Sequence, residues 1–383
     1  MDDVTPGDLL RSFEDMEDPR RHNTVHPMGT IILLAVMGVT CDCGGWKAIH
    51  RWAKANTEWL ETWLEMPHGV PSPDTFRRFF TALDPDSFER CFIAWTAELV
   101  PLSGGKLIAF DGKTARGSGD QVEGNSPLHM VSAWCEDNRV VLGQVATEQK
   151  SNEITAIPKL LQLLDLKGAT VSIDAMGCQK DIATQIIKGE GDYLLAVKDN
   201  HPTLYADLQL FFDDATEQND PGLIRLGQPQ VDGDHGRIEI RQVWASGDVG
   251  WLKRLGHEWT GLKGIICMEA QREVLGPNGG TSVERRYYLT SHDPKELGAE
   301  KLLELTRGHW GVENRLHWCL DVSFNEDQCR IRKGNAAENF SRLCRISLNL
   351  LKAEKSERLG IANKRKLCGW DRNYLLKVLM NLG

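Results

Sequence analysis

The chain has 383 residues, of which 41% are hydrophobic and 26% charged, and its formal net charge is −9. That length allows two or three domains with a large core, and the acidic balance argues against a protein that coats DNA uniformly. The longest apolar run, residues 31–39, is too short to span a bilayer, and the acidic N-terminus lacks the features of a signal peptide. We therefore expect a cytoplasmic protein without membrane contact.

Residues 1–100 are predicted to form an N-terminal helical domain rich in tryptophan. Trp46, Ile49 and Ala53 recur at helical spacing and share one face, and Trp59 and Trp63 share another. Faces of this kind are typical of helices that pack on a core.

The same segment contains a helix start signal and two arginines. Ser72 or Asp74 is the expected cap of the helix that follows, TFRRFFTAL. Arg77 and Arg78 are candidates for DNA contact, and a plain surface role is an equal alternative. No helix-turn-helix signature is sharp, so DNA binding by this domain is one of two hypotheses.

Residues 101–213 follow the order strand, hairpin, helix, strand, helix, strand, helix. Apolar residues at helical spacing predict the helices, at 153–164, 180–188 and 202–212. Short apolar runs bounded by turn residues predict the strands, at 107–110, 130–135, 140–147, 170–173 and 193–197. This is the order of an RNase H-like core, an α/β fold with a mixed sheet in which the first and fourth strands are neighbours.

Residues 214–296 are predicted to be a β-rich insertion in that core. Alternating or clustered apolar residues indicate strands at 237–243, 264–271 and 283–290, and Pro-Asn-Gly-Gly at 277–280 is a strong turn signal. Trp251 and Trp259 are candidates to stack on an unpaired base, although packing in the core is the favoured interpretation.

Three acidic residues are the candidate catalytic groups and metal ligands. Asp111 and Asp174 each follow a predicted strand, and Glu313 lies in a predicted helix of the last segment, 297–383. Two strand-end carboxylates and one helix carboxylate are what a two-metal phosphoryl-transfer site needs. Mg²⁺ suits such a site because it prefers oxygen ligands, and Mn²⁺ is an expected substitute. We expect the carboxylates of Asp111 and Asp174 to approach within roughly 7 Å.

Two other glutamates compete with Glu313 for this role. Glu304 lies nine residues earlier and points to roughly the opposite face of a helix, because each residue advances about 100°. Glu326 lies in a polar run that is more typical of a turn. Glu313 is therefore the preferred candidate.

Basic charge is concentrated near the C-terminus. Residues 301–383 carry 16 Lys and Arg against 9 Asp and Glu, whereas the remaining 300 residues carry 29 against 45. This asymmetry favours DNA contact there. Arg330, Arg332 and Lys333 form one cluster, which is a candidate phosphate clamp, and residues 364–366 form a second. A solvated surface is the alternative for each.

Histidines and cysteines suggest a weaker metal hypothesis. His309, Glu313 and His317 are spaced by four residues, which would place them on one helix face and could bind zinc. The magnesium hypothesis already uses Glu313, so one histidine is instead a candidate to orient it or to contact phosphate. The ten cysteines include only one close pair, Cys41 and Cys43, and free buried thiols are expected.

Several segments give the chain a specific resemblance. FDGKTARGS, SIDAMGCQKDIA, GDYLLAVKDNHPTL, YYLTSH and the long run RGHWGVENRLHWCLDVSFNEDQCRIRKGNAAENFSRLCRISLNLLK carry it. The sequence resembles the DDE transposases of bacterial insertion sequences, in the subgroup that includes the H-repeat-associated proteins. The resemblance implies an RNase H-like catalytic core, Mg²⁺ dependence, a β insertion that helps to hold the DNA end, and the triad Asp111, Asp174 and Glu313.

One departure concerns the residues around the glutamate. Related transposases surround it with a Tyr-x2-Arg-x3-Glu-x6-Lys signature, and at those offsets this chain has Thr306, His309, Glu313 and Leu320. Arg307 and Arg315 lie close by and are candidates for phosphate contact in place of the missing residues, and His309 is a separate candidate. Lys113 and Lys198, each close to a predicted strand end, are further candidates to neutralise phosphate.

The expected function is cutting and joining of double-stranded DNA at transposon ends and target sites, by a homodimer in the DNA complex. Two alternatives stay open. One is a metal-dependent DNA nuclease without strand transfer, and the other is a domesticated DNA-binding protein that no longer cuts. The presence of the triad argues against the domesticated protein, but it does not distinguish a nuclease from a transposase.

Overall fold

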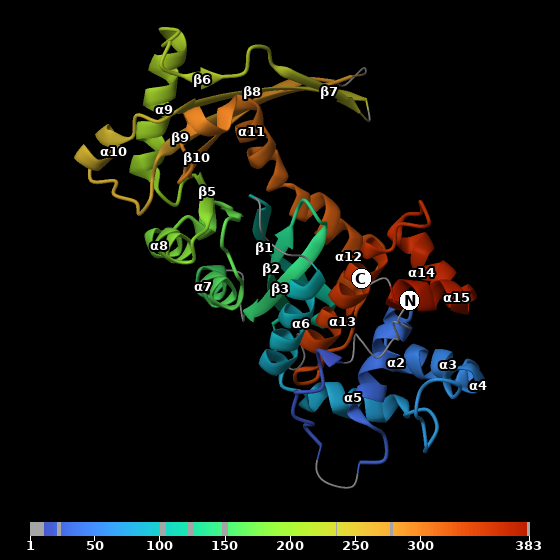
Figure 1. Cartoon of the computed structure of the whole chain (residues 1–383). Coiled ribbons are helices and arrows are strands. Elements are labelled where there is room, and N and C mark those ends of the chain that lie inside the picture. Colours follow the sequence, from blue (N-terminus) through green and yellow to red (C-terminus); the bar gives the residue numbers. More distant parts are fainter. Residues whose placement is uncertain are drawn as a thin grey trace. The chain divides into compact units, whose positions relative to one another are not determined.

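A computed structural model of the chain describes residues 11–20, 24–99, 105–120, 124, 126–147, 152–234, 236–275 and 279–380. The chain divides into two compact units. The first combines residues 1–101, 112–164 and 313–383, and the second combines 102–111 and 165–312. Each unit thus draws on more than one of the four predicted segments, as the blue, teal and red parts of the first unit illustrate (Figure 1).

The second unit is built on a mixed sheet with strand order β1-β4-β5-β10-β9-β8-β6, and β7 also pairs with β8. Strand β4 runs parallel to β1 on one side and to β5 on the other, whereas the later strands are antiparallel. The strands are β1 (Leu107–Ala115), β4 (Thr170–Ile173), β5 (Asp192–Val197), β6 (Ile224–Arg225), β7 (Gln230–Asp234), β8 (Arg237–Ser246), β9 (Gly264–Val274) and β10 (Thr281–Thr290).

The predicted insertion forms strands at the expected places and continues the core sheet. Strands β8, β9 and β10 include the three predicted runs, and β10 pairs with β5 of the core. Pro277 and Asn278 of the predicted turn lie outside the described residues. Of the two tryptophans considered for base stacking, Trp259 is 8% exposed and Trp251 stacks on Phe211, with ring centroids 5.2 Å apart. Trp259 is therefore packed in the core, whereas Trp251 is half-buried against Phe211.

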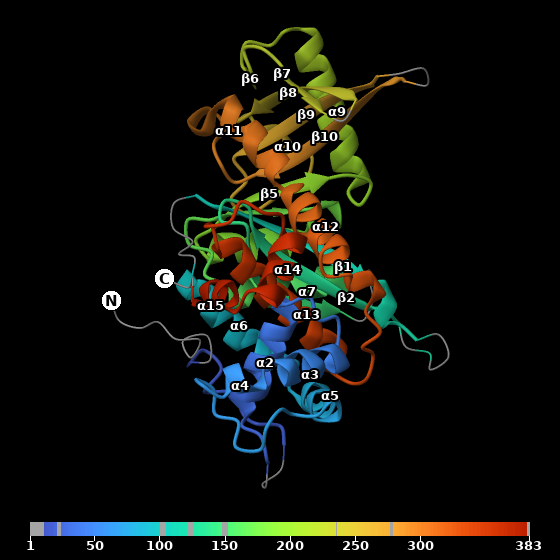
Figure 2. The ribbon, with the colours of Figure 1, turned by 90° about the vertical axis from the view of Figure 1, so that its right-hand side faces the viewer.

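Two long helices cover opposite faces of this sheet (Figure 2). Neighbouring residues of a strand point to opposite faces. Tyr287 packs on Phe212 of α9 (Pro202–Glu217), whereas Tyr288 belongs to the apolar cluster that includes Leu302 of α11 (Pro294–Gly308). The shorter helices are α8 (Lys180–Lys188), α10 (Gly250–Arg254) and the 3-10 turn η3 (Ala175–Gly177).

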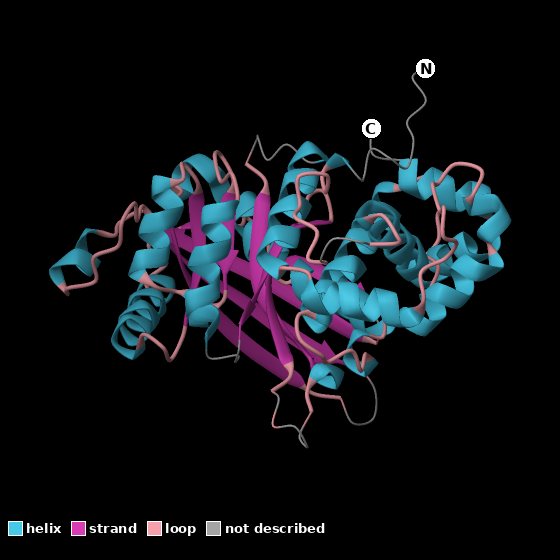
Figure 3. Ribbon diagram, turned by 90° about the horizontal axis from the view of Figure 1, so that it is seen from below, coloured by secondary structure: helices cyan, strands magenta, loops and turns pink. Residues whose placement is uncertain are grey.

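The first unit is mainly helical, and its central helix α13 (Ala336–Ala353) is buried. Figure 3 draws the helices of the chain in cyan and its strands in magenta. Helices α2 (Met28–Thr40), α5 (Pro73–Ala82) and α6 (Pro85–Leu99) and strand β3 contact α13. The remaining elements are α3 (Trp46–Ala55), α4 (Thr57–Leu60), η1 (Arg116–Ser118), β2 (Leu128–Cys135), β3 (Val140–Thr147), α7 (Glu153–Leu163), α12 (Trp318–Val322), η5 (Glu326–Gln328), α14 (Ile361–Trp370) and α15 (Arg372–Met380).

Helix α2 is almost entirely buried, which explains its apolar sequence. A helix that is apolar on every side is typical of a buried position. None of the helices in the described ranges is both long and apolar enough to span a membrane.

The N-terminal helices confirm the predicted faces and cap. Trp46, Ile49 and Ala53 are the buried residues of α3, and the rings of Trp59 and Trp63 lie 5.4 Å apart. Ser72 caps α5, because its Oγ accepts a hydrogen bond from the backbone N–H of Thr75 at 3.1 Å. Both arginines of this helix pair with Asp74. The ten cysteines are free, and most of them are buried.

The strand order identifies the fold. Strands β3, β2 and the last residues of β1 are consecutive in the first unit, where β2 and β3 form an antiparallel hairpin, and β1, β4 and β5 are consecutive in the second. This is the arrangement expected for an RNase H-like core, so the predicted α/β fold class with a mixed sheet and N-terminal helices is confirmed.

Candidate active site

Asp111 and Asp174 occupy matched positions on neighbouring parallel strands. The register pairs Phe110 of β1 with Ile173 of β4, so the next residue of each strand is an aspartate. Neighbouring strands lie about 4.8 Å apart. The register therefore brings the backbones of the two aspartates side by side in the second unit, and both side chains are half-buried.

The carboxylate of Asp174 is fixed by its own backbone. Its Oδ1 accepts hydrogen bonds from the N–H groups of Met176 at 3.1 Å and Gly177 at 3.4 Å, which caps the 3-10 turn η3. Asp is a preferred residue at such a cap because its short side chain reaches these N–H groups. One carboxylate oxygen is thus held in place, and Oδ2 makes neither of these two bonds.

His309 lies close to Asp174 in the second unit. Its Nδ1 is 3.0 Å from the Oγ of Ser172, which is two residues before Asp174 on the path of β4. Alternate residues of an extended backbone point to the same face, and Asp174 is itself extended, so Ser172 and Asp174 share a face. Burial lowers the pKa of His309 to about 4, opposed by the Asp174 carboxylate and reinforced by the cations of Arg286 and Lys198.

The low pKa of His309 leaves its ring uncharged at neutral pH. A neutral ring brings no positive charge to a phosphate, so His309 is better suited to orienting its neighbours than to neutralising DNA. Lys198, by contrast, is exposed at the end of β5 and carries its charge into solvent. Among the candidate phosphate contacts, Lys198 is the lysine or arginine that belongs to the same unit as both aspartates.

Glu313 lies on an irregular part of the polypeptide instead of a regular helix. It is exposed, in the π-helical turn η4 (Val312–His317) that precedes α12. Such turns have one extra residue and occur often at functional sites. The extra residue also disturbs the four-residue spacing that would align His309, Glu313 and His317. Within the described ranges, no group of three His, Cys, Asp or Glu residues could hold a metal, so the zinc hypothesis gains no support.

Lys113 is buried in an acidic cluster of the first unit. Its Nζ lies 2.6 Å from Asp321, 3.4 Å from Asp327 and 4.0 Å from Glu326, and the residue is 8% exposed. The sequence suggested a phosphate contact, but the charge of this lysine is already matched by carboxylates. A DNA phosphate would have to compete with them.

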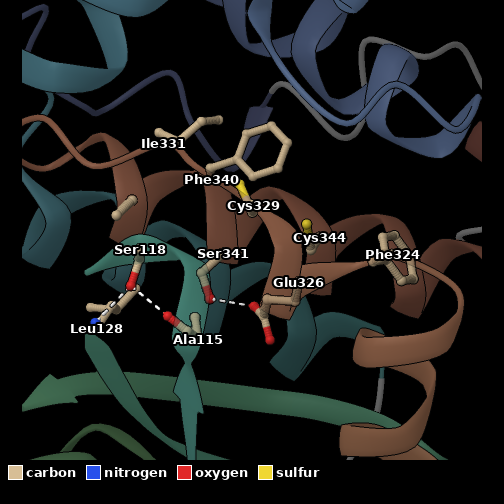
Figure 4. A pocket seen from close by; sticks show the side chains of 11 residues that line it. Ala115, Ser118, Leu128, Phe324, Glu326, Cys329, Ile331, Phe340, Ser341 and Cys344 are labelled. Atoms are coloured by element: carbon tan, nitrogen blue, oxygen red, sulfur yellow. Dashed lines mark hydrogen bonds between the residues drawn. The ribbon is translucent and has the colours of Figure 1, made fainter. Parts of the chain in front are cut away.

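The predicted basic segment is exposed on the first unit. Arg330, Arg332 and Lys333 all face solvent, and Arg332 donates hydrogen bonds to the Gly117 carbonyl at 3.0 Å and to Asp120 at 2.9 Å. Between the two arginines, Ile331 helps to line a mainly apolar pocket with Phe340 and the cysteines 329 and 344 (Figure 4). Ile331 therefore anchors the segment and leaves the basic side chains outside.

Other basic residues are engaged within the first unit. Arg315 is exposed and pairs with Glu136. In the second cluster, 364–366, Lys366 is exposed, whereas Lys364 pairs with Glu354 at 3.0 Å and Arg365 donates to the Val39 carbonyl at 2.7 Å. Both side chains are almost fully buried, so the solvated alternative was wrong for them.

A buried polar group next to β1 was missed by the sequence reasoning. The Nε2 atom of His129 in β2 lies 2.7 Å from Oε1 of Glu153 in α7, and its Nδ1 lies 2.7 Å from the Thr114 hydroxyl. His129 and Glu153 are 2% and 3% exposed. His129 lies one residue before the predicted strand 130–135, and Glu153 is the first residue of the predicted helix 153–164, so neither residue stood out in the sequence.

The donor set of the second unit fits a hard divalent cation. Asp111 and Asp174 offer carboxylate oxygens, which Mg²⁺ and Mn²⁺ prefer. His309, which interacts electrostatically with Asp174, lies within hydrogen-bond distance of Ser172. Oxygen ligands without thiolates are the expected chemistry for magnesium rather than zinc.

Two family models and several curated relatives match the sequence of this chain. Residues 10–96 match the family described as DDE_Tnp_1-associated, and residues 102–350 match the one described as Transposase DDE domain. The chain is 39% identical over 372 residues to “Putative transposase YncI” of Escherichia coli O157:H7, which covers 97% of this chain and 94% of the relative. It is 38% identical over 365 residues to “H repeat-associated putative transposase YhhI” of Escherichia coli K12, with coverage of 94% and 93%. A solved piggyBac transposase synaptic complex with hairpin DNA is similar at a TM-score of 0.44 and 11% identity, over 99% of this chain and 81% of that one.

Proposed function

The chain belongs to the DDE transposase family, and from that membership we propose that it cuts DNA at insertion-sequence ends and joins them to target DNA. In the first step, water attacks the phosphorus at the transposon end, and the bond to the 3′ oxygen breaks. In the second, the freed 3′ hydroxyl attacks a phosphodiester of the target, whose own 3′ oxygen leaves. Neither step needs a covalent bond between protein and DNA.

The observation that supports this proposal is the register of β1 and β4. It brings Asp111 and Asp174 to adjacent strand positions, from elements more than 60 residues apart in sequence. Two carboxylates on one half-buried edge repel each other unless a cation lies between them. Two carboxylates in these positions are therefore favourable only when they bind a cation.

DDE transposase domains generally depend on divalent metal ions, and we propose Mg²⁺ here, with Mn²⁺ as a substitute. Asp111 and Asp174 would hold it, and Glu313 is the third proposed ligand. When bound, the ion neutralises charge that develops at the phosphodiester and lowers the pKa of water. The capping bonds to Asp174 Oδ1 keep that carboxylate in one orientation, so Oδ2 is the oxygen left for a ligand role.

Double-stranded DNA, as transposon end and as target, is the proposed partner, and a homodimer is the proposed assembly on DNA. Arg330, Arg332 and Lys333 are the proposed phosphate contacts of the first unit, and Lys198 that of the second. Arg315 and His309 stay in the proposal in lesser roles, because one is paired with Glu136 and the other is uncharged. A protein that acts on bacterial DNA would work in the cytoplasm.

The test is a cleavage assay on the DNA that flanks the gene, with and without added target. Cleavage that needs Mg²⁺, together with joined products when target is present, is the expected result. Cleavage without joined products would favour the nuclease alternative. Binding without cleavage would favour a domesticated DNA-binding protein and overturn the proposal.

A further inference from the structure

Three hydrogen-bonded residues lie in or against β1, the strand that contains the proposed metal ligand Asp111. The chain of hydrogen bonds runs from Glu153 at the start of α7 through His129 of β2 to Thr114 of β1, with both bonds at 2.7 Å. All three residues belong to the first unit, together with Gly112 and the end of β1.

Gly112, the residue after Asp111, makes a close approach to this chain. A Cβ atom added at Gly112 would lie 2.3 Å from Oε1 of Glu153 and 2.5 Å from Nε2 of His129. Real Cβ atoms do not approach other atoms that closely, so glycine is needed for the pair to pack against the backbone. The backbone that follows Asp111 is therefore in contact with His129 and Glu153, the two most buried of the three hydrogen-bonded residues.

The strand geometry sets the direction of each side chain. Alternate residues of a strand share a face, so Gly112 and Thr114 face the His129–Glu153 pair, and Asp111 and Lys113 point to the other face. Lys113 agrees with this, since it pairs with Asp321 and Asp327 and not with Glu153. These hydrogen-bonded residues therefore pack on the face of β1 that is opposite to the side chain of Asp111.

Burying a carboxylate and a histidine is a costly way to hold a strand, because each loses its hydration. Apolar side chains of similar volume would pack at least as stably, but they would not fix the strand by directional bonds. Groups that orient metal ligands are usually of the polar, directional kind.

We propose that Thr114, His129 and Glu153 are positioning residues for Asp111, and that they set the affinity of this ligand for a divalent cation. The proposal rests on the function proposed above, because it takes Asp111 to be a metal ligand. These residues do not themselves contact metal or DNA; they act through the backbone of β1. The alternative is that they only stabilise the fold.

The experiment compares one substitution at two places in the full-length protein. Thr114→Val removes the hydroxyl that bonds His129 and keeps the shape of the side chain. The matched control is Thr96→Val, which removes a buried hydroxyl bonded to the Leu142 carbonyl at 2.8 Å, elsewhere in the first unit. Thr114→Ser restores the hydroxyl. Mn²⁺ binding, measured by calorimetry or electron paramagnetic resonance, is the readout, with thermal unfolding beside it.

The expected result is Mn²⁺ binding about tenfold weaker in Thr114→Val, with wild-type binding in Thr96→Val and Thr114→Ser. Wild-type affinity in a folded Thr114→Val, or an equal loss in both valine variants, would overturn the proposal. If Thr114→Val does not fold, Glu153→Gln replaces it, because the amide keeps the size and acceptor oxygen but loses the charge. Wild-type Mn²⁺ binding by that variant would equally overturn the positioning role.

The same measurements separate this inference from the proposed function. A wild-type protein that binds Mn²⁺ but leaves end DNA uncut would refute the function, while the Thr114 comparison would still decide the positioning role. A wild-type protein that binds no Mn²⁺ would refute both.

Discussion

Asp174 offers a way to separate a stabilising role from a catalytic one in a single residue. Its Oδ1 caps η3 through the N–H groups of Met176 and Gly177, and its charge is the proposed metal-binding feature. Asn caps about as well as Asp, whereas Ala leaves both N–H groups without this acceptor. Asp174→Asn should therefore keep the cap and lose the charge, and Asp174→Ala should lose both.

The size of the effect follows from the cap. Loss of such a cap costs about 1 kcal/mol, and for a unit of this size that lowers Tm by about 2–4 °C. We expect Asp174→Ala to show this shift, Asp174→Asn to unfold near the wild-type temperature, and both to cut end DNA only at background. Calorimetric unfolding and a single-turnover cleavage assay measure the two properties. An Asn variant that cuts normally would remove Asp174 from the triad, and one as unstable as the Ala variant would refute the capping argument.

Three further outcomes are expected. Asp111→Ala and Glu313→Ala should each abolish metal-dependent cleavage in a folded protein, and a wild-type rate in either variant would exclude that residue from the site. The control is Glu304→Ala, which should cut normally because Glu304 is exposed and pairs with Lys301. Replacement of Arg330, Arg332 and Lys333 by Ala should weaken DNA binding regardless of sequence and lower the salt slope by roughly one unit for each phosphate that the variant no longer binds, and an unchanged slope would place the segment outside the DNA path. The folded-state pKa of His309 is about 4, below its ordinary value, so the folded chain binds fewer protons between about pH 6.5 and 4. As the pH is lowered from about 6.5 to 4, the free energy of unfolding should therefore decrease, by up to about 1.4 kcal/mol per pH unit. His309→Gln should flatten this dependence in urea titrations, and an unchanged dependence would contradict the argument.

The core strands and helices could be predicted because their patterns are local. Helix α8 begins and ends where its apolar spacing predicts, and β4 ends one residue before Asp174 as expected. The pairing of β10 with β5 could not be predicted, because strand pairing depends on contacts between residues about 90 positions apart. The β insertion therefore looked separate in sequence although it extends the core sheet.

The charged residues show where sequence reasoning ends. Lys113 was a candidate phosphate contact and Arg365 belonged to a candidate basic cluster, but Lys113 pairs with Asp321 and Arg365 donates to backbone carbonyl groups. A sequence shows that a residue is charged and does not show which partner reaches it. His129 and Glu153 were overlooked for the same reason, since each is unremarkable alone and only the fold brings them together. The two aspartates were found because their position after apolar strands is itself a local pattern.

The interleaving of the two compact units has a consequence for damaged copies of the gene. The first unit needs residues from the beginning, the middle and the end of the chain, and α2 and α5 pack on α13, which is translated last among the three. A frameshift or premature stop anywhere before residue 336 would leave the buried face of α2 without its cover. Such a product would expose a large apolar surface and be a substrate for cellular proteases. Decayed copies should therefore leave no stable protein fragment that competes for the ends of an intact element.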